Sequence, residues 1–149
     1  EMCIRDRHKG WIGDIEKVGR TNVTFPIIAD EDLTVSKAFD MLPEEFVLPD
    51  GRTPADSETV RSVYIIGPDK KLKLSMTYPM TVGRNFAEVL RALDGLQTSA
   101  NRGVATPANW VPGDDVVIPL SINDTDAKAK FGEFKADVPY LRLAPLPKD

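Results

Sequence analysis

Residues 60–78 of this chain read VRSVYIIGPDKKLKLSMTY, and this stretch carries the pattern that decides the fold class. Its first part, residues 60–66, is a nearly continuous run of β-formers, which predicts a central strand covered on both faces. Gly67 and Pro68 begin a turn. From residue 71 to residue 78 polar and apolar side chains alternate, which predicts a half-exposed strand at a sheet edge.

Upstream of this hairpin the sequence predicts two helices and a short strand. Apolar residues recur at helical spacing over residues 8–18, and Gly19 follows them where a left-handed cap costs least. The apolar run at 25–30 predicts a brief strand. A second helix follows it, with Asp32 or Thr34 as the N-cap.

Downstream, the helical pattern that begins at Asn85 is the strongest in the chain, and we expect this helix to pack on the sheet. Beyond residue 100 the pattern weakens. It predicts a strand at 116–118, a short helix at 124–131 and an extended stretch at 140–143. Because prolines concentrate in this half, we expect residues 101–149 to form an extended arm that packs onto something else.

The composition excludes several classes of protein. The chain has 149 residues, 42% of them apolar, which is enough for one core, and a net charge of −4 that offers no basic face for nucleic acid. No apolar run approaches the roughly 20 residues that span a membrane. A lone cysteine forms no internal disulfide and no CxxC pair, so we expect no metal or cofactor and a cytoplasmic location.

The first seven residues, EMCIRDR, follow neither a helical nor a strand period. The chain also begins with Glu1 ahead of Met2, unlike a native translation start. We therefore interpret residues 1–7 as a non-native leader outside the fold, and the rest as a fragment of a longer protein.

Several short motifs along the chain match one family in its own order. The matching blocks are His8-x-x-Trp11, FPIIAD at 25–30, Arg61, GPDKKLKL at 67–74, Tyr78-Pro79, GRNF at 83–86 and VATPxxW at 104–110. In these blocks the chain resembles the one-cysteine peroxiredoxins of the peroxiredoxin 6 type, from about His8 to the end. It departs from them in one respect, because their Pro-x-x-x-Thr-x-x-Cys motif is absent.

The resemblance implies an α/β fold, a truncated thioredoxin-like peroxiredoxin domain at 8–100 followed by the C-terminal extension arm at 101–149. It also implies a thiol-dependent peroxidase that reduces hydrogen peroxide and organic hydroperoxides through a cysteine sulfenic acid, with an external thiol as the reductant. Without the nucleophilic cysteine, we expect this fragment to be inactive. The alternative function is a non-catalytic thioredoxin-like binding or dimerisation module.

Two arginines are the candidate catalytic residues. Arg61 interrupts an apolar strand and matches the family's active-site arginine. The alternative is a purely structural role, an ion pair with a loop acid such as Glu58. Arg84, within the GRNF block, is a second candidate. An arginine beside the site lowers the pKa of the thiol, and its planar fork can hydrogen-bond the peroxide oxygens.

Three other residues stay outside the catalytic set. Cys3 has no Thr three residues earlier, so we interpret it as an inert thiol. His8 is interpreted as an exposed histidine, and Asp69 as the aspartate of a Pro-Asp turn. From the resemblance we also expect a homodimer, formed by the edge strand at 71–78 and the arm, with neither nucleic acid nor membrane as a partner.

Overall fold

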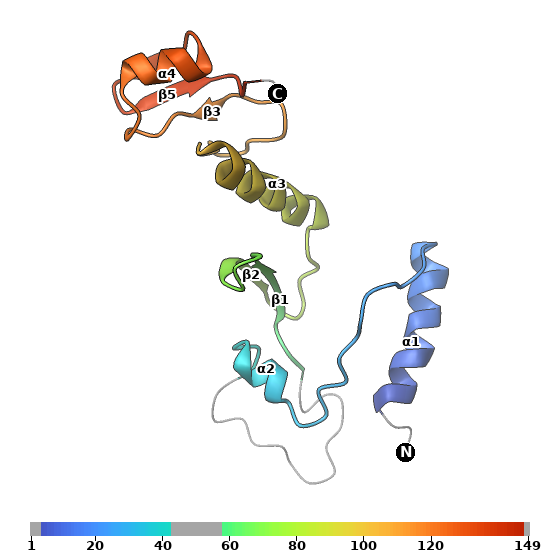
Figure 1. Ribbon diagram of the computed structural model, residues 1–149. Helices are drawn as coiled ribbons and strands as arrows, with labels where there is room; N and C mark the ends of the chain where they lie inside the picture. The colour runs from blue at the N-terminus through green and yellow to red at the C-terminus, as the bar shows by residue number, and fades with distance from the viewer. Residues whose placement is uncertain (1–3, 43–57, 148–149) are drawn as a thin grey trace. The chain divides into compact units, whose positions relative to one another are not determined.

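The computed structural model describes residues 4–42 and 58–147 of the chain. The described residues fall into two compact units: those up to residue 62, with residues 77–82, belong to the first, and residues 63–76 with those from 83 onward belong to the second. Figure 1 shows the order of the elements, from the blue helix near the N-terminus to the red strand near the C-terminus. The domain boundaries predicted at residues 7 and 100 stay predictions.

Helix α1, Ile4–Gly19, confirms the first predicted helix and is longer than predicted. It begins at Ile4, so residues 4–7 are helical although the sequence pattern placed them outside the fold. The predicted cap at Gly19 is wrong. Arg20, with a φ of 49°, takes the left-handed conformation instead, because the helix continues through the glycine before the chain reverses.

The apolar run at 25–30 forms no strand with any described residue, so that prediction is wrong. A strand requires a neighbour that exchanges backbone hydrogen bonds with it, and the described part of the chain offers none here. The side chains of Phe25 and Ile28 are 63% and 65% exposed. This segment has the composition of a strand without the pairing of one.

Helix α2, Thr34–Ala38, is a single short turn whose first amides are held by Asp30 and Asp32. The two carboxylate oxygens of Asp30 accept hydrogen bonds from the backbone N–H groups of Val35 and Ser36, both at 2.8 Å. The sequence pattern assigned this capping role to Asp32 or Thr34. Asp32 takes part of this role, since its Oδ1 accepts a hydrogen bond from the backbone N–H of Thr34 at 3.2 Å, and Asp30 adds the two further contacts.

Strands β1, Arg61–Ile66, and β2, Leu72–Tyr78, form a two-stranded sheet. The alternation predicted for β2 is confirmed, since its polar positions are exposed and Leu74, Met76 and Tyr78 are half-buried. The central position predicted for β1 is wrong within the described residues, where its one neighbour is β2 and Ile66 is 53% exposed.

Helix α3, Phe86–Arg102, confirms the strongest helical prediction. The side chain of Asn85 caps it by accepting a hydrogen bond from the backbone N–H of Glu88 at 3.2 Å. Gly103 ends the helix in the left-handed conformation, and its N–H donates to the carbonyl of Ser99. The helix therefore has both of the end signals that the sequence carries.

The C-terminal elements form a small α/β layer structure within the second unit. Strands β3 (Val116–Val117), β5 (Leu141–Ala144) and β4 (Lys135–Val138) form an antiparallel sheet in that order, and helix α4 (Asp124–Phe131) lies with them at the top of Figure 1. The strand predicted at 116–118 and the helix at 124–131 are confirmed.

The main cluster of buried side chains lies in this C-terminal part. Its members are Val104, Trp110, Val116, Ile118, Ala127, Phe131 and Ala144. The prediction of a loose arm is therefore wrong. Prolines at 107, 112 and 119 fall in its turns, while the apolar residues between them meet across the sheet and helix.

Candidate functional site

Arg61 is the first residue of β1, and its side chain is exposed. Its neighbour Ser62 contacts Thr77 of β2, with the two hydroxyl oxygens 3.0 Å apart. Within the described residues the guanidinium of Arg61 has no ion pair, so the alternative pairing with Glu58 is not found. The apolar strand pattern suggested a desolvated charge. The charge is solvated instead, because Arg61 is the exposed first residue of β1.

Arg84 lies just before α3, and its side chain is also exposed. Its guanidinium carbon is 5.6 Å from the centroid of the Phe86 ring, which is a cation–π arrangement. Arg61 belongs to the first unit and Arg84 to the second. Within the described residues neither guanidinium forms an ion pair, and the catalytic role of both arginines stays a prediction.

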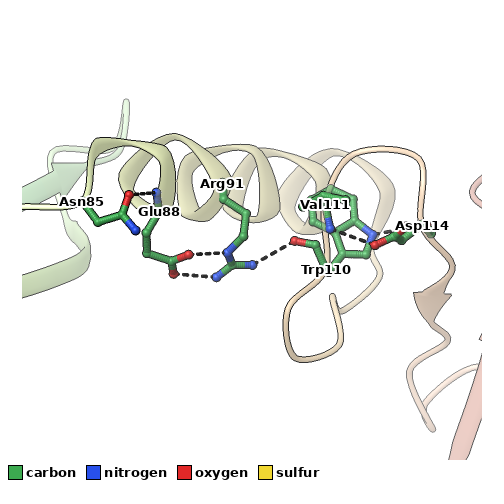
Figure 2. Close-up of polar contacts among 6 residues, drawn as sticks. All are labelled: Asn85, Glu88, Arg91, Trp110, Val111 and Asp114. Carbon is green, nitrogen blue, oxygen red and sulfur yellow. Dashed lines mark hydrogen bonds and ion pairs between the residues drawn. The ribbon is translucent and has the colours of Figure 1, made fainter.

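A polar network on α3 lies close in sequence to Arg84 (Figure 2). Arg91 holds Glu88 with both arms of its fork, from Nε to Oε2 at 2.6 Å and from Nη2 to Oε1 at 2.8 Å. Its third donor, Nη1, reaches the backbone carbonyl of Trp110 at 3.1 Å. The hydrogen bond from Arg91 lowers the pKa of Glu88, and the same contact raises the pKa of Arg91.

This network was missed in the sequence, although a signal for it exists. Glu88 and Arg91 are three residues apart on a predicted helix, the spacing at which side chains of opposite charge meet. The partner that makes the pair unusual is Trp110, which lies 19 residues further along. No local spacing could have identified that contact.

The loop at 110–114 fixes the position of the accepting carbonyl. Trp110 is 3% exposed, and its indole Nε1 donates to the carbonyl of Asp114 at 3.2 Å. The backbone N–H of Val111 donates to Oδ2 of Asp114 at 3.1 Å. The Trp110 carbonyl thus belongs to a hydrogen-bonded turn, and the indole ring of the same residue is buried in the core.

His8 and Cys3 are two further residues that the sequence analysis singled out. His8 is half-buried, not exposed as predicted, and its ring centroid is 6.5 Å from that of Trp11. It lines a cavity of about 440 Å³ in the first unit, together with Ile12 and Phe25. Cys3 lies outside the described residues.

The interpretation of Asp69 as a turn residue is confirmed. Its Oδ1 accepts a hydrogen bond from the N–H of Lys71 at 3.2 Å, and its Oδ2 forms an ion pair with Lys73 at 2.7 Å. The hydrogen bond from Lys73 lowers the pKa of Asp69. Asp69 therefore closes the turn between β1 and β2.

Residues 4–42 and 58–147 contain no group of three or more His, Cys, Asp or Glu side chains placed to hold a metal ion. In that same part of the chain, no helix has the length and apolar character that crossing a membrane requires.

Comparison with known proteins supports the resemblance along nearly the whole chain. Residues 95–133 match the family model of the C-terminal domain of 1-Cys peroxiredoxin. The chain is 48% identical to the mitochondrial peroxiredoxin PRX1 of Saccharomyces cerevisiae, over 93% of this chain and 52% of that protein. It is 48% identical to 1-Cys peroxiredoxin A of Oryza sativa subsp. japonica, over 91% of this chain and 63% of the relative.

A third relative is covered more fully. The chain is 46% identical to a protein named "Probable 1-Cys peroxiredoxin" from Bromus secalinus, over 91% of this chain and 68% of that protein. The chain thus spans between about half and two thirds of the length of these relatives.

Two solved structures have the same fold. A yeast mitochondrial 1-Cys peroxiredoxin matches with a TM-score of 0.80 and 46% identity, over 93% of this chain and 64% of that one. A cysteine-to-serine variant of peroxiredoxin 6 from Arenicola marina matches with a TM-score of 0.81 and 43% identity, over 95% of this chain and 66% of that one. The predicted α/β, thioredoxin-like fold class is confirmed.

The predicted cytoplasmic location is contradicted by these comparisons, because the yeast relative is a mitochondrial protein. The prediction depended on the single cysteine. A chain with one cysteine forms no internal disulfide, which is compatible with any reducing compartment. Cysteine content therefore separates secreted proteins from intracellular ones, but it does not distinguish the cytoplasm from the mitochondrion.

Proposed function

The chain belongs to the 1-Cys peroxiredoxin family, and from this premise we propose that it supplies the arginine-bearing part of a thiol-dependent peroxidase. The substrates we propose are hydrogen peroxide and organic hydroperoxides. The observation that supports this most directly is the 46% identity to a relative of which the chain covers 68%. In the described structure the guanidinium of Arg61 is exposed and forms no ion pair, which is consistent with a side chain that binds a ligand.

In the proposed reaction a cysteine thiolate attacks one peroxide oxygen and the O–O bond breaks. The sulfur becomes a sulfenic acid, and the other oxygen leaves with a proton as water or an alcohol. An external thiol then condenses with the sulfenic acid, which releases water and forms a mixed disulfide, and a second thiol cleaves that disulfide to regenerate the cysteine. Arg61 and Arg84 would favour the thiolate over the thiol and stabilise the charge on the departing oxygen.

The 149-residue polypeptide has Cys3 as its one cysteine, and the Pro-x-x-x-Thr-x-x-Cys motif is absent from its sequence. We therefore propose that this polypeptide by itself has no peroxidase turnover. Given hydrogen peroxide and a thiol reductant, it should consume peroxide at the background rate. Robust turnover that Cys3→Ser abolishes would contradict this part of the proposal.

The proposed partners are the peroxide, an external thiol and a second copy of the chain. The solved yeast relative is described in terms of thiol resolution through the glutathione and thioredoxin systems, which suggests a small or protein thiol as the reductant. For the homodimer we propose pairing through β2, since its backbone is paired on one side by β1 in the described structure.

A chimera tests the arginine roles. Residues 8–149 would replace the matching part of rice 1-Cys peroxiredoxin A, which is 48% identical and supplies its own cysteine. We expect a peroxidase, in which Arg61→Ala and Arg84→Ala each lower kcat/KM for peroxide by about 100- to 1,000-fold, the usual effect of losing one charge-stabilising donor. Arg20→Ala, at another exposed arginine, is the matched control and should change little.

The chimera also separates the two classes of function. A folded chimera that reduces no peroxide would favour the non-catalytic binding or dimerisation module. An active chimera whose activity survives both arginine substitutions would leave the family intact and remove Arg61 and Arg84 from the site.

A further inference from the structure

Arg91 joins two parts of the second unit that are far apart in the sequence. Two of its donors hold Glu88 in the first turn of α3, and the third holds the carbonyl of Trp110 in the loop that follows the helix (Figure 2). All three hydrogen bonds are 3.1 Å or shorter. A single guanidinium therefore connects the start of α3 to the C-terminal layer structure.

From Glu88 the contacts continue to the start of the helix. The backbone N–H of Glu88 donates to Oδ1 of Asn85, the N-cap residue, at 3.2 Å. Arg84 is the residue directly before Asn85. The conformation of the cap therefore sets the direction in which the chain, with Arg84, leaves the helix.

The other end of this connection is rigid. Trp110 is 3% exposed within the main core cluster, and its indole is hydrogen-bonded to Asp114. The loop lies close to α3 where the helix carries Gly95: a Cβ there would be 3.4 Å from Oγ1 of Thr106 and 4.0 Å from Cε3 of Trp110. The Trp110 carbonyl is thus a fixed acceptor.

The energy of the pair alone does not explain this arrangement. The side chains of Arg91 and Glu88 are 29% and 40% exposed, and ion pairs this accessible contribute about 1 kcal/mol or less to stability. A lysine would give a similar charge, but its single ammonium cannot hold both carboxylate oxygens and a carbonyl in one plane. The arginine fork is suited to fixing geometry.

We propose that Arg91 is a positioning residue for Arg84, which holds the first turn of α3 against the core through Glu88 and the Trp110 carbonyl. This rests on the proposed function, which gives Arg84 its role in the site. Arg91 itself touches no reacting group. Its effect is to keep the arginine before the helix in one orientation.

The experiment uses the full 149-residue chain, labelled with ¹⁵N, and Arg91→Lys. We expect the amide hydrogen of Glu88, which is bonded to the cap, to exchange at least tenfold faster. We also expect the Nε–Hε signal of Arg84 to move toward that of a free arginine. The amides of Ala127 and Ala144, in the core cluster, should keep their exchange rates.

Two further variants make the test specific. The charge swap Glu88→Arg with Arg91→Glu keeps an ion pair at the same spacing but turns a carboxylate toward the Trp110 carbonyl, so the order of Arg84 should not return. Asp94→Ala is the matched control on the same helix, an exposed acid, and should leave the Arg84 signal in place.

The inference would be overturned by an Arg84 signal unchanged in Arg91→Lys, or by full recovery in the charge swap. A uniform rise in exchange across the second unit would also overturn it, since that is the mark of a general structural role. None of these readouts requires peroxidase activity. If the coupling is found but the chimera keeps its activity without Arg84, the proposed role of Arg84 in the site fails and the coupling stands.

Discussion

Arg142 of β5 donates a hydrogen bond from Nη1 to Oδ1 of Asp124, the first residue of α4, at 2.8 Å. Its Nη2 donates to two backbone carbonyls, those of Pro119 at 2.6 Å and Ile122 at 2.8 Å. The side chain of Arg142 is 6% exposed, whereas that of Asp124 is 78% exposed. One buried guanidinium thus holds the turn between β3 and α4 against β5.

We predict unequal costs for removing the two partners. Arg142→Lys loses the planar fork that donates to Asp124 and to both backbone carbonyls at once, and should lower the free energy of unfolding by about 1–3 kcal/mol. Asp124→Asn removes an exposed charge and should cost less than about 1 kcal/mol. Urea unfolding would be followed by the fluorescence of Trp110 in a Trp11→Phe background. Equal costs would show that the exposed ion pair, and not the carbonyl contacts, dominates.

Two glycine substitutions should have opposite signs. Gly103 has a φ of 63°, so Gly103→Ala should destabilise the second unit by about 1 kcal/mol, the cost of a left-handed residue with a Cβ. The added Cβ would find only Lys130 Nζ at 4.0 Å, so the cost comes from the backbone. Gly13→Ala, within α1 and with open space around it, should increase helicity. Circular dichroism at 222 nm and urea unfolding measure both.

The carboxylate of Asp30 should titrate below its ordinary value of 3.8. Partial burial acts to raise its pKa. Hydrogen bonds from the Ser36 hydroxyl at 2.5 Å and from two backbone amides together outweigh this effect, so the pKa is lowered. The carboxylate's contribution to stability is therefore complete above the unfolded pKa, and is lost as the pH falls through the lower folded value.

Carbon-13 NMR of the Asp30 carboxyl measures this titration. In Ser36→Ala the pKa should rise toward 3.8, because one of the hydrogen bonds that lower it is gone. Ser75→Ala, an exposed serine of β2, is the control. An unchanged pKa in Ser36→Ala would mean that the backbone amides account for the whole effect.

The proposed homodimer predicts a difference between the two strands of the hairpin. Leu72 on β2 and Ile66 on β1 are 56% and 53% exposed. Leu72→Lys should weaken the association because it places a charge at the proposed interface, while Ile66→Lys serves as the matched control. Sedimentation equilibrium would measure the dissociation constant. A wild-type chain that stays monomeric at high concentration, or equal effects of both variants, would count against pairing through β2.

Local sequence patterns predicted most of the elements well. Apolar residues recur at helical spacing from Asn85 onward, and the structure has α3 at that place. Likewise the alternation along 71–78 gives β2. These features depend on residues within a few positions of one another, so the sequence is sufficient to find them.

The failures involve contacts between distant residues. The run at 25–30 has the composition of a strand, but no described segment pairs with it. Residues 101–149 are rich in proline and look loose along the sequence, yet Val116 and Ala144, which are paired in the sheet, are both fully buried. Periodicity reports what one segment can form and does not report which segments meet.

The amino-acid sequence by itself pointed to the family, to helices α1, α3 and α4 and the hairpin of β1 and β2, and to the two arginines proposed for the site. The tertiary structure alone decided that the core lies in the C-terminal elements and that Arg91 reaches Trp110. The physical reason is the range of the interactions. Helix periodicity and capping act over one or two turns of chain, whereas burial and the third hydrogen bond of a guanidinium depend on which distant segments pack together.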